Sequence, residues 1–360
     1  MGLLKFNTSP IGIDWGTRSI NAIQLRRTRA GWNLAALASM PRSLTFSQGT
    51  VEEQKEHCQE EIQQLASSLY RHGFTGRQIV LAVPKDKLLS AILELPPKAA
   101  QAPLDQLARI EFARVQKCEP HSFEMAYWEL PASARQSKLT SVMAVGCRHS
   151  DSESALTPFE KVGFDCPRLD TRAAALVRAS SPLLQGGTST AAILDMGFSS
   201  ASLLIVRQGM IVYDRLLVGA GLQKLQQALF ERFSLTSEAI EFVFKEIGLA
   251  PSAEHQSVAR ERLMDAVNLI ATHFEQVIKD VQVSLTYASH QYPDSPPDRL
   301  LLVGAGGSMA GLKEHFAKAL KLDVHIASPS VLVTCPPALN NIADPSLVTA
   351  LGLALAGGAL

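Results

Sequence analysis

The feature that most constrains the fold is an internal repeat, in which two distant stretches follow the same pattern. Residues 11–41 and 191–221 each begin with an apolar run that ends in Asp-x-Gly, with the acid at Asp14 and at Asp195. In both, a small hydroxyl-rich turn, a β-rich run, a polar turn with glycine and a third β-rich run follow. A repeat spaced at about half the chain predicts two related lobes rather than a solenoid.

Each Asp-x-Gly predicts a tight hairpin, because glycine tolerates positive φ and close backbone approach. Such a turn suits a phosphate-and-metal site, but Asp also commonly caps ordinary hairpins through its carboxylate. If the two lobes face each other across a cleft, both hairpins point at one ligand. The equivalent positions of Asp14 and Asp195 in the repeat favour ligand contact over the turn carboxylate.

The residues between the two repeats predict α/β packing. Thr50 and Glu53 form a capping box for a helix that ends at Gly73, and residues 78–84 predict a buried strand. Residues 86–164 then follow the order β-α-β-β-α, which predicts a small subdomain inserted into the first lobe.

The second half of the chain predicts helices followed by a strand and a glycine-rich turn. A long helix carries one apolar stripe from Val267 to Leu285, which predicts helix core. A buried strand then leads to a glycine-rich turn from Gly304 to Gly307 and to a helix that opens near Met309. Amides at such a helix start can bind phosphate or pack under an adenosine.

Composition excludes several classes of function. Lys plus Arg and Asp plus Glu each total 34, so bulk charge does not favour nucleic acid or an acidic membrane. The five cysteines form no CxxC pair, which predicts a reducing compartment, and Cys118 with His121 lacks the further ligands of a zinc site. The sequence predicts neither a signal peptide nor a membrane span, so we expect a cytoplasmic protein.

Three motifs together resemble a known superfamily. The order Asp-x-Gly-Thr, Asp-x-Gly-x-Ser-Ser and Val-Gly-Ala-Gly-Gly-Ser is similar to the phosphate-1, phosphate-2 and adenosine motifs of the actin, sugar-kinase and heat-shock ATPases. Within it, the chain resembles the PilM-type, FtsA-like branch of type IV pilus assembly proteins. The stretches that carry this narrower likeness are "GTRSINAIQL", residues 104–130, "FDCPRLDTRAAAL" and "LVTALGLALAGG".

The resemblance implies a duplicated, actin-like (ribonuclease H-like) two-lobe α/β ATPase fold with a small α+β subdomain inserted in the first lobe. It assigns residues 1–85, 165–190 and 335–360 to the first lobe core and 86–164 to the inserted subdomain. The second lobe core would comprise residues 191–220 and 294–334, with a helical subdomain at 221–293.

The resemblance also implies a site for ATP and Mg²⁺. Asp14 and Asp195 would lie near the Mg²⁺ ion through its water shell, since Mg²⁺ usually keeps several waters. The expected phosphate contacts are Gly16, Thr17, Arg18, Asn21, Gly197, Ser199 and Ser200. The expected adenosine contacts are Gly304, Ala305, Gly306, Gly307 and Met309, with Glu241 on the ribose side.

Two departures from the family pattern bear on activity. Family members often have a lysine where this chain has Asn21, and a lysine near Phe244. An amide brings no charge to a phosphate. Arg18 is the candidate substitute, although we expect it to point to solvent. Phosphoryl transfer needs neutralised charge and an oriented nucleophile. The chain offers no clear base, although Asp170 and Arg172 occupy a segment where one can sit, so we expect ATP binding with weak or absent hydrolysis.

The resemblance implies a cytoplasmic adaptor, attached to the inner membrane through a partner. That partner would be the short cytoplasmic N-terminal tail of a PilN-type single-pass protein, bound between the first lobe and the inserted subdomain, with assembly motor components contacted indirectly. The residues leave two alternatives open. One is a small-molecule kinase, which needs a substrate acid; the other is an FtsA-like filament protein, which usually carries a basic amphipathic C-terminal helix.

Overall fold

The computed structural model describes residues 8–42, 50–98, 102–132, 139–184, 190–250, 260–337, 339 and 342–357. Their contacts divide them into two compact units. The first takes in the described residues of Met1–Gly31, Ala35–Ala175 and Ala350–Leu360, and the second those of Trp32–Leu34 and Leu176–Thr349. Within the described ranges, no helix is both long and apolar enough to span a bilayer.

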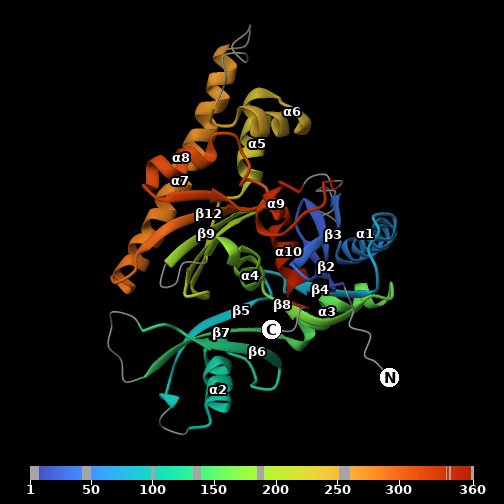
Figure 1. The fold of residues 1–360 in the computed structure, drawn as a ribbon, viewed down its shortest axis with the longest axis vertical. Helices are drawn as coiled ribbons and strands as arrows, with labels where there is room; N and C mark the ends of the chain where they lie inside the picture. The colour runs from blue at the N-terminus through green and yellow to red at the C-terminus, as the bar shows by residue number, and fades with distance from the viewer. Residues whose placement is uncertain are drawn as a thin grey trace. The chain divides into compact units, whose positions relative to one another are not determined.

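The first unit contains a five-stranded sheet in the order β3-β2-β1-β4-β8 (Figure 1). Its strands are β1 (Ile11–Trp15), β2 (Ser19–Thr28), β3 (Gly31–Pro41), β4 (Gln78–Ala82) and β8 (Asp165–Asp170). β1 pairs with β2 antiparallel and with β4 parallel, and β4 pairs with β8 parallel. Helix α1 (Val51–Arg71) begins at the predicted capping box, in which Thr50 and Glu53 bond each other's backbone amides.

The second unit repeats this sheet. The order is β11-β10-β9-β12-β13, formed by β9 (Thr190–Met196), β10 (Ala201–Arg207), β11 (Met210–Leu217), β12 (Pro297–Val303) and β13 (Asp323–Ile326). β9 takes the place of β1, because it pairs antiparallel with β10 and parallel with β12. The predicted duplication is therefore confirmed at the level of strand order and direction.

Helices complete the second unit. They are α5 (Leu222–Phe233), α6 (Ser237–Phe242), the π-helix η3 (Val243–Ile247), α7 (Arg260–Gln291), α8 (Leu312–Leu320), α9 (Pro329–Leu332) and the 3-10 turn η5 (Pro345–Leu347). The predicted apolar stripe of the long helix is core: Ile270, Phe274 and Val281 are fully buried. α7 contacts α5, α8, β11 and β12 and so joins the helical part to the sheet.

Two helices straddle the division between the units. They are α4 (Arg172–Leu184) and α10 (Val348–Leu355), and the latter is the helix predicted in the apolar tail. Leu353 of α10 packs with Val80 and Ala175 of the first unit. The units divide after Ala175 and after Thr349, whereas the sequence placed all of 165–190 and 335–360 in the first lobe.

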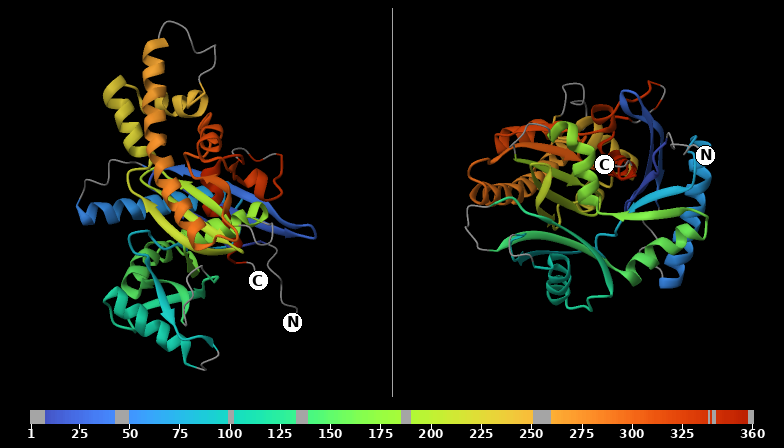
Figure 2. Two further views of the ribbon diagram at one scale, coloured as in Figure 1. Left: turned by 90° about the vertical axis from the view of Figure 1, so that its left-hand side faces the viewer. Right: turned by 60° about the horizontal axis from the view of Figure 1, so that its bottom comes forward.

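The inserted block has the predicted order of elements. It comprises β5 (Leu89–Leu95), α2 (Leu104–Gln116), β6 (Phe123–Glu129), β7 (Thr140–Arg148) and α3 (His149–Glu160). The three strands form a separate antiparallel sheet in the order β5-β7-β6. α2 lies on one face of this sheet (Figure 2), where Phe112 packs against Phe123 at 5.4 Å between ring centroids.

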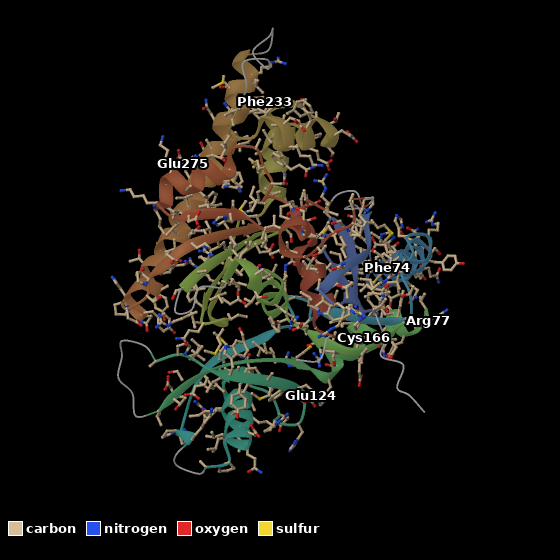
Figure 3. The ribbon with its side chains drawn as sticks, in the orientation of Figure 1. Phe74, Arg77, Glu124, Cys166, Phe233 and Glu275 are labelled. Carbon is tan, nitrogen blue, oxygen red and sulfur yellow. The ribbon has the colours of Figure 1, made fainter. Side chains whose placement is uncertain are left out.

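Helix α3 differs from the expectation that it belongs with the inserted subdomain. Its buried Phe159 packs edge-on against Trp15 of β1, at 5.4 Å between ring centroids, and also contacts Phe164. These rings join the core of the first sheet, which also holds Phe74, labelled in Figure 3. The helix therefore completes the first sheet's core, because its apolar face is turned to β1, β8 and α1 rather than to α2.

A buried ion pair holds the first Asp-x-Gly hairpin in place. The Arg42 guanidinium at the end of β3 binds the Glu61 carboxylate of α1 through Nε and Nη2, with the shortest contact at 2.8 Å. Its Nη1 donates to the carbonyl of Gly16 at 2.8 Å, and the Arg42 amide donates to the carbonyl of Arg18 at 2.7 Å. Strand β3 and helix α1 thus fix the backbone of the turn.

This pair generates a stability prediction. We expect Glu61→Gln to lower the free energy of unfolding by about 2 kcal/mol, because it leaves a largely buried guanidinium without its anion. The matched control is Glu60→Gln, since the Glu60 side chain is 70% exposed and that of Glu61 only 5%. Urea denaturation measures both variants, and equal losses for the two would contradict the role given to Arg42 and Glu61.

Candidate functional site

The two Asp-x-Gly hairpins have the same geometry. Asp14 pairs across the ladder with Asn21, and Asp195 pairs with Ser202. A Cβ added to Gly16 would lie 2.7 Å from the carbonyl oxygen of Ser19, and one added to Gly197 would lie 2.7 Å from that of Ser200. Glycine is thus required by the turn itself, whatever the turn binds.

The carboxylate of Asp14 is buried and ion-paired. Asp14 is the fourth residue of β1 and is 5% exposed, and its Oδ1 accepts a hydrogen bond of 2.6 Å from Nη1 of Arg172. Arg172 is the first residue of α4, which follows directly on β8. The sequence analysis named Arg172 only as part of a segment where a catalytic base can sit. Its ion pair with Asp14 could have been inferred from its position, because Arg172 comes two residues after β8, which runs parallel to β4 and β1.

Asn21 lies opposite Asp14 and is also buried, at 3% exposure. Its Oδ1 accepts a hydrogen bond of 2.7 Å from the Ser39 hydroxyl. The other end of the amide is a donor only. Asp14, Asn21 and Arg172 therefore form a polar cluster at the carboxyl end of β1.

Thr17 and Arg18 complete the first turn. Thr17 is exposed, whereas Arg18 is half-buried, so the expectation that Arg18 points to solvent is only partly met. In the second turn Ser199 is exposed and Ser200 half-buried. This turn is braced by α5, whose first amides, Leu222 and Gln223, donate to the carbonyls of Gly197 and Phe198.

The glycine-rich turn lies beside the second hairpin. Val303 at the end of β12 pairs with Asp195, and Gly304 follows with a φ of 80°. A Cβ on Gly304 would lie 2.5 Å from Oδ1 of Asp195, and the Gly306 amide donates to the Met196 carbonyl at 2.9 Å. The structure therefore brings two of the three predicted motifs together within one unit.

Several amides of this turn already donate to backbone carbonyls. Those of Gly304, Gly307 and Met309 donate to the carbonyls of Pro345, Gly304 and Gly306. Helix α8 starts only at Leu312, so the prediction of a helix that opens near Met309 placed the start three residues early. Close packing under a flat group suits this turn better than binding an anion.

Glu241 lies in the helical part of the second unit. It is exposed near the end of α6, one turn before Phe244 of η3. The Phe244 carbonyl accepts from the amide of Ala310, and the Ala310 carbonyl accepts from that of Leu249. The segment that carries Glu241 is thus bonded to the loop that holds Ala305, which is exposed, and Met309, which is 4% exposed.

Cys118 lies at the core of the inserted subdomain. It packs against the cluster formed by α2 and its sheet. In the part of the chain that the structure describes, no group of three or more His, Cys, Asp or Glu side chains is placed to hold a metal ion.

Comparisons with known proteins agree with this architecture. A PilM-PilN type IV pilus biogenesis complex is similar to the chain with a TM-score of 0.76 at 20% identity, covering 97% of this chain and 98% of that one. The ethanolamine utilization protein EutJ from Carboxydothermus hydrogenoformans gives 0.56 at 15% identity, with 99% and 92% covered. MreB 5 of Spiroplasma citri bound to AMPPNP gives 0.51 at 11% identity, with 97% and 95% covered.

These likenesses establish an actin-like fold. The family model described as "Type IV pilus assembly protein PilM" matches residues 12–357. Since that match spans nearly the whole sequence, the chain belongs to the PilM family of type IV pilus assembly proteins.

Proposed function

We propose that this chain is an ATP-binding adaptor of type IV pilus or related secretion assembly, which binds the cytoplasmic N-terminal tail of a PilN-type inner-membrane protein. The observation that carries the proposal is the match to the PilM family over residues 12–357. The adaptor would act in the cytoplasm and reach the inner membrane through its partner. Motor components would be contacted indirectly.

Nucleotide binding is supported by the contacts of the second unit. Asp195 is 4% exposed and lies against Gly304, so the second hairpin and the glycine turn form one surface of small residues. Small residues let a ligand approach the backbone closely. In this proposal ATP lies with its phosphates at Gly197, Ser199 and Ser200 and its adenosine along Gly304–Gly307, with Glu241 on the ribose side.

Slow or absent hydrolysis is part of the proposal. Asn21 is buried and accepts a hydrogen bond from the Ser39 hydroxyl, and as an amide it brings no positive charge. Rapid phosphoryl transfer would require further neutralisation and an oriented water. Binding of the nucleotide makes smaller demands, because it needs only contacts and a closed surface.

The first test concerns ATP. We expect Asp195→Asn to weaken ATP binding in the presence of Mg²⁺ by at least about tenfold, which corresponds to about 1.4 kcal/mol. The control is Asp298→Asn. Asp298 is exposed near the start of β12, whereas Asp195 pairs with Val303 at the other end of that strand. Calorimetric titration measures both, and an unchanged affinity for Asp195→Asn would count against the nucleotide site.

The partner surface that we propose is the face of the three-stranded sheet opposite α2, in place of the groove between the first lobe and the inserted subdomain that the resemblance implied. The register places Ile92 of β5, Met143 of β7 and Trp128 of β6 in one row across the sheet. None of the three belongs to the α2 core cluster; Ile92 is 54% exposed, Trp128 is half-buried and Met143 is 8% exposed. Val145 and Ala126 form the next row on the same face. A band of apolar side chains runs across all three strands.

Acidic residues lie at both ends of this band. Glu94 of β5 accepts from the Ser141 hydroxyl at 2.7 Å. Glu124 of β6, labelled in Figure 3, lies 3.6 Å from the Arg109 guanidinium and 3.3 Å from His149, and its side chain is 78% exposed. Cytoplasmic segments next to a membrane-spanning helix carry an excess of Lys and Arg. A short tail that combines apolar and basic residues would therefore match the band in both polarity and charge.

The second test concerns this surface. We expect Ile92→Glu to weaken binding of a fluorescent synthetic tail by at least about tenfold, because it places a charge in the apolar band. Ile110→Glu on the outer side of α2 is the matched control, since Ile110 is 55% exposed and Ile92 54%. Fluorescence anisotropy with tails of candidate single-pass pilus proteins measures the affinity of both variants. An equal loss of affinity in Ile92→Glu and Ile110→Glu would exclude the proposed face.

We expect only weak coupling between ATP and the tail. Coupling requires that the tail binds two states of the protein with different affinity. Calorimetry of the tail with and without ATP and Mg²⁺ measures it, and equal affinities would show that the two ligands bind independently.

A further inference from the structure

The hairpin of β2 and β3, labelled in Figure 1, continues beyond the buried part of the first sheet. Strand β2 is buried over residues 20–25, whereas all of residues 26–31 are exposed. At about 3.3 Å per residue, the exposed end of β2 alone is about 10 Å long. Three of the exposed side chains are arginines, Arg26, Arg27 and Arg29. Residues 26–31 thus form a short basic projection, which we call the arginine hairpin.

Buried polar contacts fix the base of the arginine hairpin. The Gln24 side chain donates to the carbonyl of Thr75 at 2.7 Å and accepts from the amide of Thr75 at 2.9 Å. It also donates to the carbonyl of Ser9 at 3.0 Å. At the tip, the Thr28 hydroxyl donates to the carbonyl of Gly31 at 2.9 Å. The arginines are therefore presented from an anchored strand pair.

The equivalent hairpin of the second unit lacks this projection. Asn21 and Ser202 occupy the same place in the repeat, since each pairs with the aspartate of its own Asp-x-Gly motif. Counted from them, Arg26 is equivalent to Arg207. Strand β10 ends at Arg207, which is 6% exposed and lies 2.6 Å from Asp294, whereas β2 continues beyond Arg26. The duplicated fold therefore does not require an exposed basic end at this strand.

The residues around the arginine hairpin in the sequence carry no opposite charge. No Asp or Glu stands between Trp15 and Glu52. Among the described side chains, none forms an ion pair with Arg26 or Arg29. Asp14 lies at the other end of β2, roughly 20 Å from the tip, which is about two Debye lengths at physiological salt. The hairpin therefore keeps a positive potential although the whole chain has no net charge.

We propose that the arginine hairpin binds the anionic phospholipid headgroups of the membrane that holds the partner tail. The inference rests on the proposed function only for the presence of that surface beside the chain. Guanidinium groups pair well with phosphate, and each arginine near an anionic bilayer raises the partition constant by about fivefold. Three arginines together give about a hundredfold, which orients a protein that a tail already tethers.

Nucleic acid is the less favoured ligand. Proteins that bind duplex DNA through its backbone commonly neutralise about six to ten phosphates, and the arginine hairpin supplies only three guanidinium groups. A bilayer has no such requirement, because its headgroups adapt to a small basic tip.

The test is sedimentation of the full chain with vesicles at millimolar lipid, made of phosphatidylcholine alone or with about one third phosphatidylglycerol. We expect the wild type to bind only the anionic vesicles and to be released by high salt. The triple variant Arg26→Gln, Arg27→Gln, Arg29→Gln is expected to partition at least about tenfold less. The matching triple change to Lys is expected to stay within about fivefold of the wild type, because the charge remains.

The matched control removes three charges from helix α8 through Lys313→Gln, Lys318→Gln and Lys321→Gln. These lysines are also exposed, but they lie near Glu314 and Asp323 in the sequence. We expect this variant to partition within about twofold of the wild type. Both Gln triples are expected to unfold at the wild-type urea concentration, because they change exposed side chains only.

Three results would overturn the assignment: equal binding to neutral and anionic vesicles, equal losses for the two Gln triples, or failure of the wild type to bind vesicles. Tighter binding to a short RNA or DNA duplex than to vesicles, lost in the hairpin Gln triple, would assign the hairpin to nucleic acid instead. We expect that triple to bind the synthetic tail as the wild type does. A wild type that binds anionic vesicles but no tail would support the hairpin and overturn the proposed adaptor.

Discussion

The architecture depends on two central strands that are hydrogen-bonded on both sides, antiparallel to one neighbour and parallel to the other. β1 lies between β2 and β4, and β9 lies between β10 and β12. A strand in that position is buried along its length, so its polar groups gather where it ends. Asp14 and Asp195 are the carboxylates at those two ends, and each is at most 5% exposed.

The two ends have diverged in the groups that surround the acid. Beside Asp14 lie a guanidinium and an amide, whereas Asp195 lies beside Ser202 and a glycine turn whose missing Cβ leaves room for its carboxylate. The duplicated backbone therefore repeats, while the residues described beside the two buried acids differ. Arg172 and Asn21 lie beside Asp14, and Ser202 and Gly304 lie beside Asp195.

The sequence was sufficient for the duplication, the capping box of α1, the order of the inserted elements and the apolar face of α7. Each of these depends on local pattern, such as periodicity or a pair of capping residues. It was insufficient for Arg172, Arg42 and Glu61, because their partners lie far along the chain: Arg172 and Asp14 are 158 residues apart. The start of α8 was predicted too early for a related reason. Amides of the glycine turn donate to carbonyls such as those of Pro345 and Met196, which lie far along the chain, instead of starting a helix.

Helix α3 has a mechanical consequence for the subdomain that precedes it. β7 ends at Arg148 and α3 begins at His149, so no flexible residue separates the inserted sheet from a helix that packs into the first core. The opposite connection is also braced, since Lys87, just before β5, lies 3.5 Å from Asp151 of α3. A displacement of the inserted sheet would therefore be passed through α3 to Trp15 and the turn after β1.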